Sequence, residues 1–187
     1  MSRITWLGLV PVLAPLACYS AQYLTVEQAQ RVLFPEATSF AKKPLVLTGD
    51  QAKKIEKRSD TRVRSQDLTL FEALKGKKRL GWVFIDEVVG KHEFITYAVG
   101  INPEGKVGGI EILVYRETYG GEVRQAEWRR QFHGKTSKNP VKLEEDIKNI
   151  SGATLSSKHL TDGVRRLLAT YDEAIRNEKK TSANAKL

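Results

Sequence analysis

Three stretches rich in β-branched and aromatic residues follow one another between residues 80 and 115, with only short connections between them. They cover residues 80–89, 94–101 and 107–115. Residues 102–105 (NPEG) place proline and glycine where a tight turn needs them. Strands joined by such short turns run antiparallel. The sequence therefore predicts an antiparallel β-meander.

The most regular helical pattern lies after the meander, from residue 157 to about residue 176. Its apolar stripe consists of Leu160, Val164, Leu167, Leu168, Tyr171 and Ile175. Residues 122–132 are also predicted to be helical, with Trp128 and Phe132 spaced to pack on the sheet. Gly163 lies inside the long helix at a mild cost in helix propensity. An antiparallel sheet packed by helices, with a closing amphipathic helix, is an α+β fold.

Residues 21–79 are predicted to be mainly helical. Residues 25–34 begin with a capping box at Thr25. Two further short helices are expected over residues 50–58 and 67–75. The chain is thus expected to contain a targeting segment (1–20), an N-terminal helical basic segment (21–79), a sheet-containing domain (80–176) and a polar tail (177–187).

The first twenty residues have the composition of a secretory signal. Arg3 is their only charged residue. The apolar run 4–17 is interrupted by two prolines, so it is too short and too interrupted for a transmembrane helix. Cleavage after Ser20 is the preferred interpretation. Lipoprotein processing, which would leave a lipidated Cys18, and a retained N-terminal anchor are the alternatives. We therefore expect a periplasmic protein, free or held at the membrane by one of these two means.

Sulfur and charge are distributed unevenly along the chain. The single Met and the single Cys both lie in residues 1–20, so the remainder has no thiol for disulfide, zinc or haem chemistry. Residues 42–79 contain twelve basic and five acidic side chains. This is typical either of a solvated surface or of a docking surface for an acidic partner or anionic lipid. Nucleic acid is not expected as a partner, because interleaved aromatic side chains are lacking and the protein is exported.

Motifs for hydrolytic, nucleotide-binding or metal chemistry are missing from the sequence. His92, His133 and His159 are scattered, without the spacing of metal ligands. No nucleophile elbow, P-loop or dinucleotide-binding loop occurs. The adjacent acids at 86–87 and 144–146 are interpreted as surface charges. No metal site and no catalytic residue is therefore assigned.

Residues 150–157 (ISGATLSS), immediately before the long helix, have the chemistry of an anion site. Gly152 and Ala153 let a bulky group approach the backbone closely. The helix that follows offers unpaired N–H groups and the positive end of its dipole. Three hydroxyl groups accompany them, those of Thr154, Ser156 and Ser157. An ordinary serine N-cap after a tight turn would give the same pattern, so the residues alone leave both interpretations open.

The four residues 151–154 (SGAT) resemble the flavinylation motif [S/T]-G-A-T of the FMN-binding domain family. That domain occurs in flavinylated subunits of the sodium-pumping NADH:quinone reductase and of the Rnf complex. Residues 117–121 (ETYGG), which follow the strand beginning at Gly105-Lys106-Val107, are similar to the family's ET-x-G loop. With the closing helix, the resemblance covers roughly residues 80–175 and implies an FMN-binding domain over 80–176.

The resemblance implies that FMN is joined through a phosphoester to Thr154 by an exported flavin transferase that uses FAD and Mg²⁺. The other residues expected to bind the cofactor are Ser151, Gly152, Ala153, Leu155, Ser156, Ser157, Glu117, Thr118, Tyr119, Gly120 and Gly121. Tyr119 is expected to stack on the isoalloxazine ring. N–H groups near Ser156 and Ser157, with Lys158, are expected to neutralise the phosphate.

One position departs from the family pattern. Lys148 stands where the family usually has Asp, three residues before the Ser or Thr, and Asp146 lies two positions earlier. The usual acid is expected to be read by the transferase, so its absence bears on the efficiency of attachment.

The implied function is electron transfer by an exported, FMN-carrying protein with a membrane-bound redox partner. Two alternatives remain open: a flavin-dependent reductase of ferric or quinone-type acceptors, and a flavin-free basic docking module.

Overall fold

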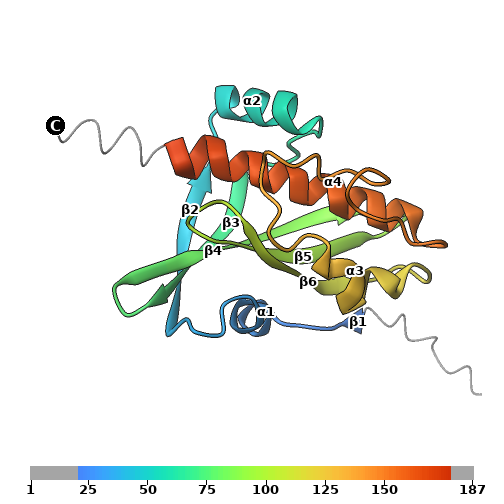
Figure 1. Ribbon diagram of the computed structural model, residues 1–187, viewed down its shortest axis with the longest axis horizontal. Helices are drawn as coiled ribbons and strands as arrows, with labels where there is room; N and C mark the ends of the chain where they lie inside the picture. Colours follow the sequence, from blue (N-terminus) through green and yellow to red (C-terminus); the bar gives the residue numbers. More distant parts are fainter. Residues whose placement is uncertain (1–20, 178–187) are drawn as a thin grey trace, which may run out of the picture.

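A computed structural model describes residues 21–177 and shows one six-stranded antiparallel sheet with helices on both faces (Figure 1). The strand order is β1-β6-β5-β4-β3-β2. The strands are β1 (Ala21–Gln22), β2 (Ser39–Val46), β3 (Asp67–Lys75), β4 (Lys78–Val89), β5 (Phe94–Ile101) and β6 (Val107–Tyr115). Strands β4, β5 and β6 are the predicted meander, which is confirmed together with the α+β class.

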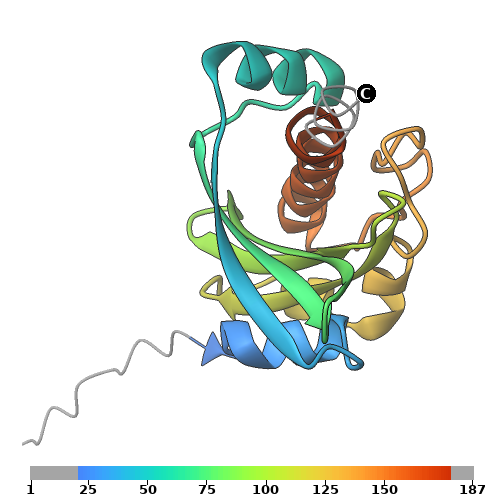
Figure 2. The same cartoon turned by 90° about the vertical axis from the view of Figure 1, so that its left-hand side faces the viewer.

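The meander is buried on both faces because helices cover both. Side chains alternate along β4, so Trp82 and Phe84 enter the larger core while Val83 enters the smaller one. Figure 2 shows α4 (Thr154–Thr170) and α2 (Gly49–Ser59) on one side of the sheet and α1 (Val26–Leu33) on the other. The larger core therefore lies between α4 and the sheet.

The predicted amphipathic helix is confirmed, and it begins earlier than expected. The apolar stripe of α4 is buried along its whole length and continues through the π-helical turn η2 (Tyr171–Arg176). The helix predicted over 122–132 is divided into the 3₁₀ turn η1 (Gly121–Arg124) and α3 (Ala126–Arg130). Trp128 and Phe132 are nevertheless both buried, with their rings edge to face at 5.1 Å.

The helix expected over residues 67–75 is wrong, because this stretch forms β3. Its apolar residues fit either period, and pairing with β2 on one side and β4 on the other decides in favour of the strand. Strand β2 was not predicted either. The helical description of residues 21–79 therefore holds only for α1 and α2, and residues 79 and 80 both lie inside β4.

Part of the basic stretch lies on an edge of the sheet. Strand β2 is one of the two edge strands and carries Lys42, Lys43 and Pro44 in succession. Lysine and proline on an edge strand oppose pairing with another chain. Lys43 and Arg79 both form ion pairs with Glu72, at 3.6 and 2.6 Å. These basic residues therefore have a structural role within the protein, which does not depend on a binding partner.

Asp86 is not the surface charge that the sequence suggested. The buried guanidinium of Arg166 on α4 pairs with its carboxylate at 2.5 Å. Tyr97 on β5, which is fully buried, donates its hydroxyl to the same carboxylate oxygen at 2.6 Å. A buried network of this kind is stable only when each group is satisfied, and here the three groups satisfy one another. Glu87, the next residue, is exposed as expected.

The expected targeting segment (1–20) and most of the expected polar tail (177–187) lie outside the described residues. Within residues 21–177, none of the helices combines the length and the apolar character needed to cross a bilayer.

Candidate functional site

The two stretches singled out by the sequence meet at one hollow of about 370 Å³. One is the acceptor turn (residues 150–154), which leads into α4, and the other is the glycine loop (residues 117–121), which follows β6. The β4–β5 turn forms the remaining wall. The lining residues are Lys91, His92, Glu117, Thr118, Tyr119, Gly152, Ala153, Thr154, Leu155 and Ser156.

The acceptor turn is shaped by small residues. Gly152 has φ +84°, a left-handed conformation that favours glycine. Ala153 is the buried N-cap of α4 and makes no side-chain cap, so the helix begins at Thr154. The interpretation of an ordinary serine N-cap is therefore wrong. The first turn of a helix lacks intrahelical acceptors for its N–H groups. Residues 154–156 therefore offer backbone N–H groups, at the positive end of the helix dipole, beside the hollow.

The three hydroxyl groups of the motif have different surroundings. Thr154 is exposed, and its Oγ1 accepts a hydrogen bond from Nδ2 of Asn149 at 3.2 Å. Ser157 is buried inside the helix and donates its Oγ–H to the carbonyl of Ala153 at 2.9 Å. Ser156 is also buried, with its Oγ 3.1 Å from the hydroxyl of Tyr115. Thr154 is thus the hydroxyl of the three that an external enzyme can reach.

The glycine loop approaches the acceptor turn closely at Gly120. This residue has φ +86°, and a Cβ added to it would lie 3.3 Å from the Cβ of Ala153 and 2.6 Å from Oη of Tyr115. Any larger residue at Gly120 or Ala153 would separate the two segments. Sequence reasoning placed both residues at the site but missed Tyr115, which ends β6 as an ordinary aromatic strand residue.

Glu117 holds the third wall in place. Its Oε1 accepts hydrogen bonds from the backbone N–H of His92 at 2.5 Å and of Glu93 at 2.9 Å. A Cβ on Gly90 would lie 2.5 Å from the same oxygen, so only glycine leaves room for this contact. Partial burial alone would raise the pKa of the Glu117 carboxyl, but these N–H groups stabilise its charged form and hold the pKa below its ordinary value.

The variant Glu117→Gln is therefore expected to lower stability at neutral pH and to flatten its dependence on acid. A carboxylate with a depressed folded-state pKa stabilises the fold above its unfolded pKa, and this contribution is lost as the pH falls through the folded-state pKa. Thermal unfolding followed from neutral to acidic pH measures the difference, with Glu122→Gln in the next turn as the charge-matched control. Parallel pH curves for wild type and Glu117→Gln would contradict the assigned contacts.

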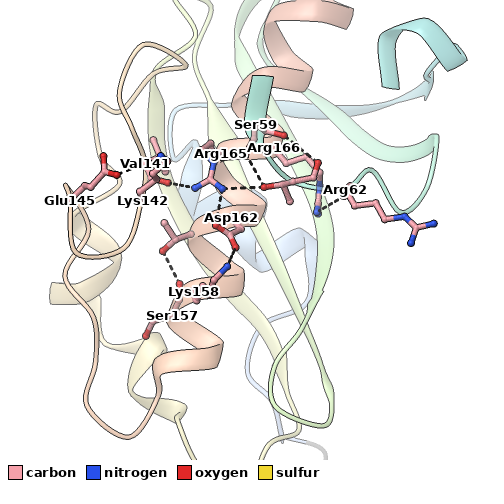
Figure 3. A network of polar contacts seen from close by, with 12 residues as sticks. Ser59, Arg62, Val141, Lys142, Glu145, Ser157, Lys158, Asp162, Arg165 and Arg166 are labelled. Atoms are coloured by element: carbon pink, nitrogen blue, oxygen red, sulfur yellow. Dashed lines mark hydrogen bonds and ion pairs between the residues drawn. The ribbon is translucent and has the colours of Figure 1, made fainter. Parts of the chain in front are cut away.

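The rim of the hollow carries two exposed apolar side chains, and a cation comes from the β4–β5 turn. Tyr119 and Leu155 are 83% and 44% exposed, which is unusual for large apolar side chains and suits contact with a planar ring. Lys158 does not point into the hollow, because its Nζ pairs with Asp162 at 2.6 Å, as Figure 3 shows. Lys91 is a cationic residue that lines it, next to the imidazole of His92.

The remaining predicted site residues lie around this hollow. Ser151 is exposed beside Gly152, and Gly121 begins η1 directly after the close contact at Gly120. Ser157 lies beneath the surface and is not among the lining residues. Its N–H donates to the carbonyl of Ala153 at 2.9 Å, so it is not free for an anion.

Asp146 does not replace the acid that the motif lacks. Its carboxylate pairs with Lys135 at 2.8 Å and accepts the N–H of Lys142 at 2.9 Å. Partial burial alone would raise the pKa of Asp146, but these contacts stabilise its charged form and keep the pKa below its ordinary value. At Lys148 the backbone is held by Gln131 and Trp128, while the residue is exposed.

This geometry defines a class of domain: an antiparallel sheet whose last strand and closing helix hold a glycine loop and a small-residue turn against each other, with an exposed threonine at a helix N-terminus. Residues 90–169 match the sequence profile of the FMN-binding domain family. The match runs from the β4–β5 turn through most of α4 and contains both segments of the site. This part of the chain is therefore similar to an FMN-binding domain.

Two curated relatives are similar over part of the chain, and both are named as subunits of ferredoxin:NAD(+) oxidoreductase complexes. The relative from the proton-translocating complex of Clostridium ljungdahlii is 33% identical over 102 residues, covering 51% of this chain and 55% of that protein. The relative from the Na(+)-translocating complex of Acetobacterium woodii is 30% identical over 86 residues, covering 41% and 42%. The chain thus spans about half the length of these relatives or less.

Among solved structures, the chain is similar to NqrC of Shewanella oneidensis. The TM-score is 0.43 at 18% identity, covering 74% of this chain and 66% of that one. This similarity is too distant to transfer residue roles.

Proposed function

We propose that this chain is an exported flavoprotein that carries FMN as a phosphoester on Thr154 and passes electrons to a membrane-bound redox partner on the periplasmic side. The observation that carries the proposal is the position of Thr154. It is the exposed hydroxyl of an SGAT motif, at a helix N-terminus, on the wall of a hollow inside the part of the chain that matches the FMN-binding domain family. The relatives named as members of oxidoreductase complexes support the electron-transfer role.

The residues present fit the cofactor. The hollow has a volume of about 370 Å³, and the small residues Gly152 and Ala153 are among those that line it. The backbone N–H groups of residues 154–156 can bind a phosphate, and the exposed ring of Tyr119 can stack on a flat aromatic group. When bound, FMN supplies the redox chemistry, and the protein supplies position and electrostatics.

Attachment requires an exported flavin transferase that uses FAD and Mg²⁺. In this transfer, Oγ1 of Thr154 loses its proton and forms a new P–O bond to the FMN phosphorus of FAD. The bond between the two phosphates of FAD breaks, and AMP leaves with the proton. A covalent tether keeps the cofactor at the site after export, where a dissociated flavin would be diluted. The nearby Lys148 in place of an acid is expected to slow recognition by the transferase without removing the acceptor.

A carrier fits the site better than a substrate-specific reductase. The groups with perturbed pKa values around the hollow, Glu117 and Tyr115, are engaged in holding the walls together, and neither is presented as a general acid or base.

The experiment that tests the function uses the protein exported together with a flavin transferase. The purified protein is expected to be yellow, to be bleached by a reductant and to be reoxidised stoichiometrically by a quinone or ferric acceptor. Steady turnover with one such acceptor would favour the reductase instead. A colourless protein under these conditions would overturn the flavin proposal and leave the basic docking module.

A further inference from the structure

We infer that Tyr115 is a positioning residue that fixes the glycine loop against the acceptor turn. Its role toward the flavin rests on the proposed function, but the two hydrogen bonds that form the bridge between loop and turn do not. The hydroxyl of Tyr115 donates to the backbone carbonyl of Tyr119 at 2.6 Å and lies 3.1 Å from Oγ of Ser156. One side chain thus connects the loop with the first turn of α4, two residues beyond the proposed acceptor.

The bridge has a defined direction. A carbonyl oxygen can only accept, so the single proton of the Tyr115 hydroxyl is committed to Tyr119. The hydrogen bond with Ser156 must then run the other way, with the serine hydroxyl donating to Oη of Tyr115. Burial raises the pKa of Tyr115 above its ordinary value, which keeps this hydroxyl protonated and able to donate.

The surroundings leave the loop few alternative positions. Tyr115 is 3% exposed, and its Oη fills the space into which any side chain at Gly120 would extend. Without the hydroxyl, the carbonyl of Tyr119 would lose a donor in a partly buried position, and leaving it unpaired there has a cost. The loop would then open toward solvent, where water can replace the missing donor.

This matters for the flavin because of Tyr119. Its side chain is 83% exposed, so the position of its ring over the hollow depends on the backbone that carries it. The Tyr115 hydroxyl fixes that backbone relative to Thr154. We therefore expect Tyr115 to restrict the motion of the ring system attached at Thr154 while taking no part in the attachment.

The test compares Tyr115→Phe with Tyr171→Phe. Tyr171 is the matched control because it is equally buried and its hydroxyl donates to a backbone carbonyl, that of Pro103, at 2.8 Å. In flavin-free protein, hydrogen exchange of residues 116–121 is expected to rise about tenfold in Tyr115→Phe, as the loss of one net hydrogen bond implies, and to stay unchanged in Tyr171→Phe. Ser156→Ala removes only the second bond and is expected to raise exchange less.

In flavin-loaded protein, Tyr115→Phe is expected to keep the covalent band on a denaturing gel and to lower the fluorescence anisotropy of the flavin. Unchanged loop exchange in Tyr115→Phe, or an equal rise in Tyr171→Phe, would overturn the bridge. Raised exchange with unchanged flavin anisotropy would overturn the positioning role. If Tyr115→Phe does not fold, Ser156→Ala decides by the same two readouts. A wild-type protein without flavin would count against the proposed function, and the exchange measurement would still judge the bridge.

Discussion

Replacing Thr154 by alanine is expected to abolish covalent flavin while leaving the fold intact. The side chain is exposed and accepts a hydrogen bond from Asn149 at 3.2 Å, so its removal costs less than about 1 kcal/mol of stability. The hydroxyl that forms the phosphoester disappears with it. Flavin fluorescence on a denaturing gel, after coexpression with an exported flavin transferase, measures the loss, which is expected to be complete.

Two variants serve as controls for this loss. Thr154→Ser keeps a hydroxyl at the same place and is expected to retain at least part of the fluorescence. Ser156→Ala removes a buried hydroxyl that points toward Tyr115 and is expected to keep the band. A band that survives in Thr154→Ala but is lost in Ser156→Ala would show that the motif is right and the acceptor is wrong.

Gly163→Ala is expected to destabilise the protein by up to about 2 kcal/mol, against the usual effect of this substitution in a helix. Alanine normally stabilises a helix interior by about 1 kcal/mol relative to glycine. Here the added Cβ would lie 3.0 Å from both Cζ of Tyr97 and Cγ1 of Val88, and closer still to the Tyr97 hydroxyl. Overpacking of this kind costs about 1–3 kcal/mol.

The cost is raised further because Tyr97 cannot simply move aside. Its ring is fully buried and its hydroxyl belongs to the network with Asp86 and Arg166. Denaturant unfolding measures the effect, and Gly49→Ala is the control, since a Cβ at the start of α2 would meet no atom within 4 Å. A Gly163→Ala protein more stable than wild type would contradict the packing of α4 on β5.

The sequence correctly predicted those parts of the fold in which the apolar residues follow a single period, that of a helix or that of a strand. The stripe from Leu160 to Ile175 can only be a buried helix face, and the meander follows from β-rich runs joined by short turns. Strand β3 was mistaken for a helix because its apolar residues fit both periods. Only its pairing with β2 and β4 resolves the ambiguity, and that pairing is a long-range contact that no local pattern contains.

The candidate site was predicted to a similar degree. The motif and the loop were found as separate segments, and the structure brings them to one hollow. The sequence could not show that Ser156 and Ser157 are buried while Thr154 is exposed, because this depends on the helix beginning at Thr154. Tyr115 was missed, and Asp86 was wrongly interpreted as a surface charge, for a related reason: each acts through a partner on α4, distant in the chain.

The central claim is a phosphoester between FMN and Thr154, and the mass of the denatured, exported protein tests it most directly. Coexpression with a flavin transferase should yield a protein heavier by one FMN less one water, and fragmentation should place that mass on Thr154. An unmodified mass, or a modification on another residue, would contradict the account.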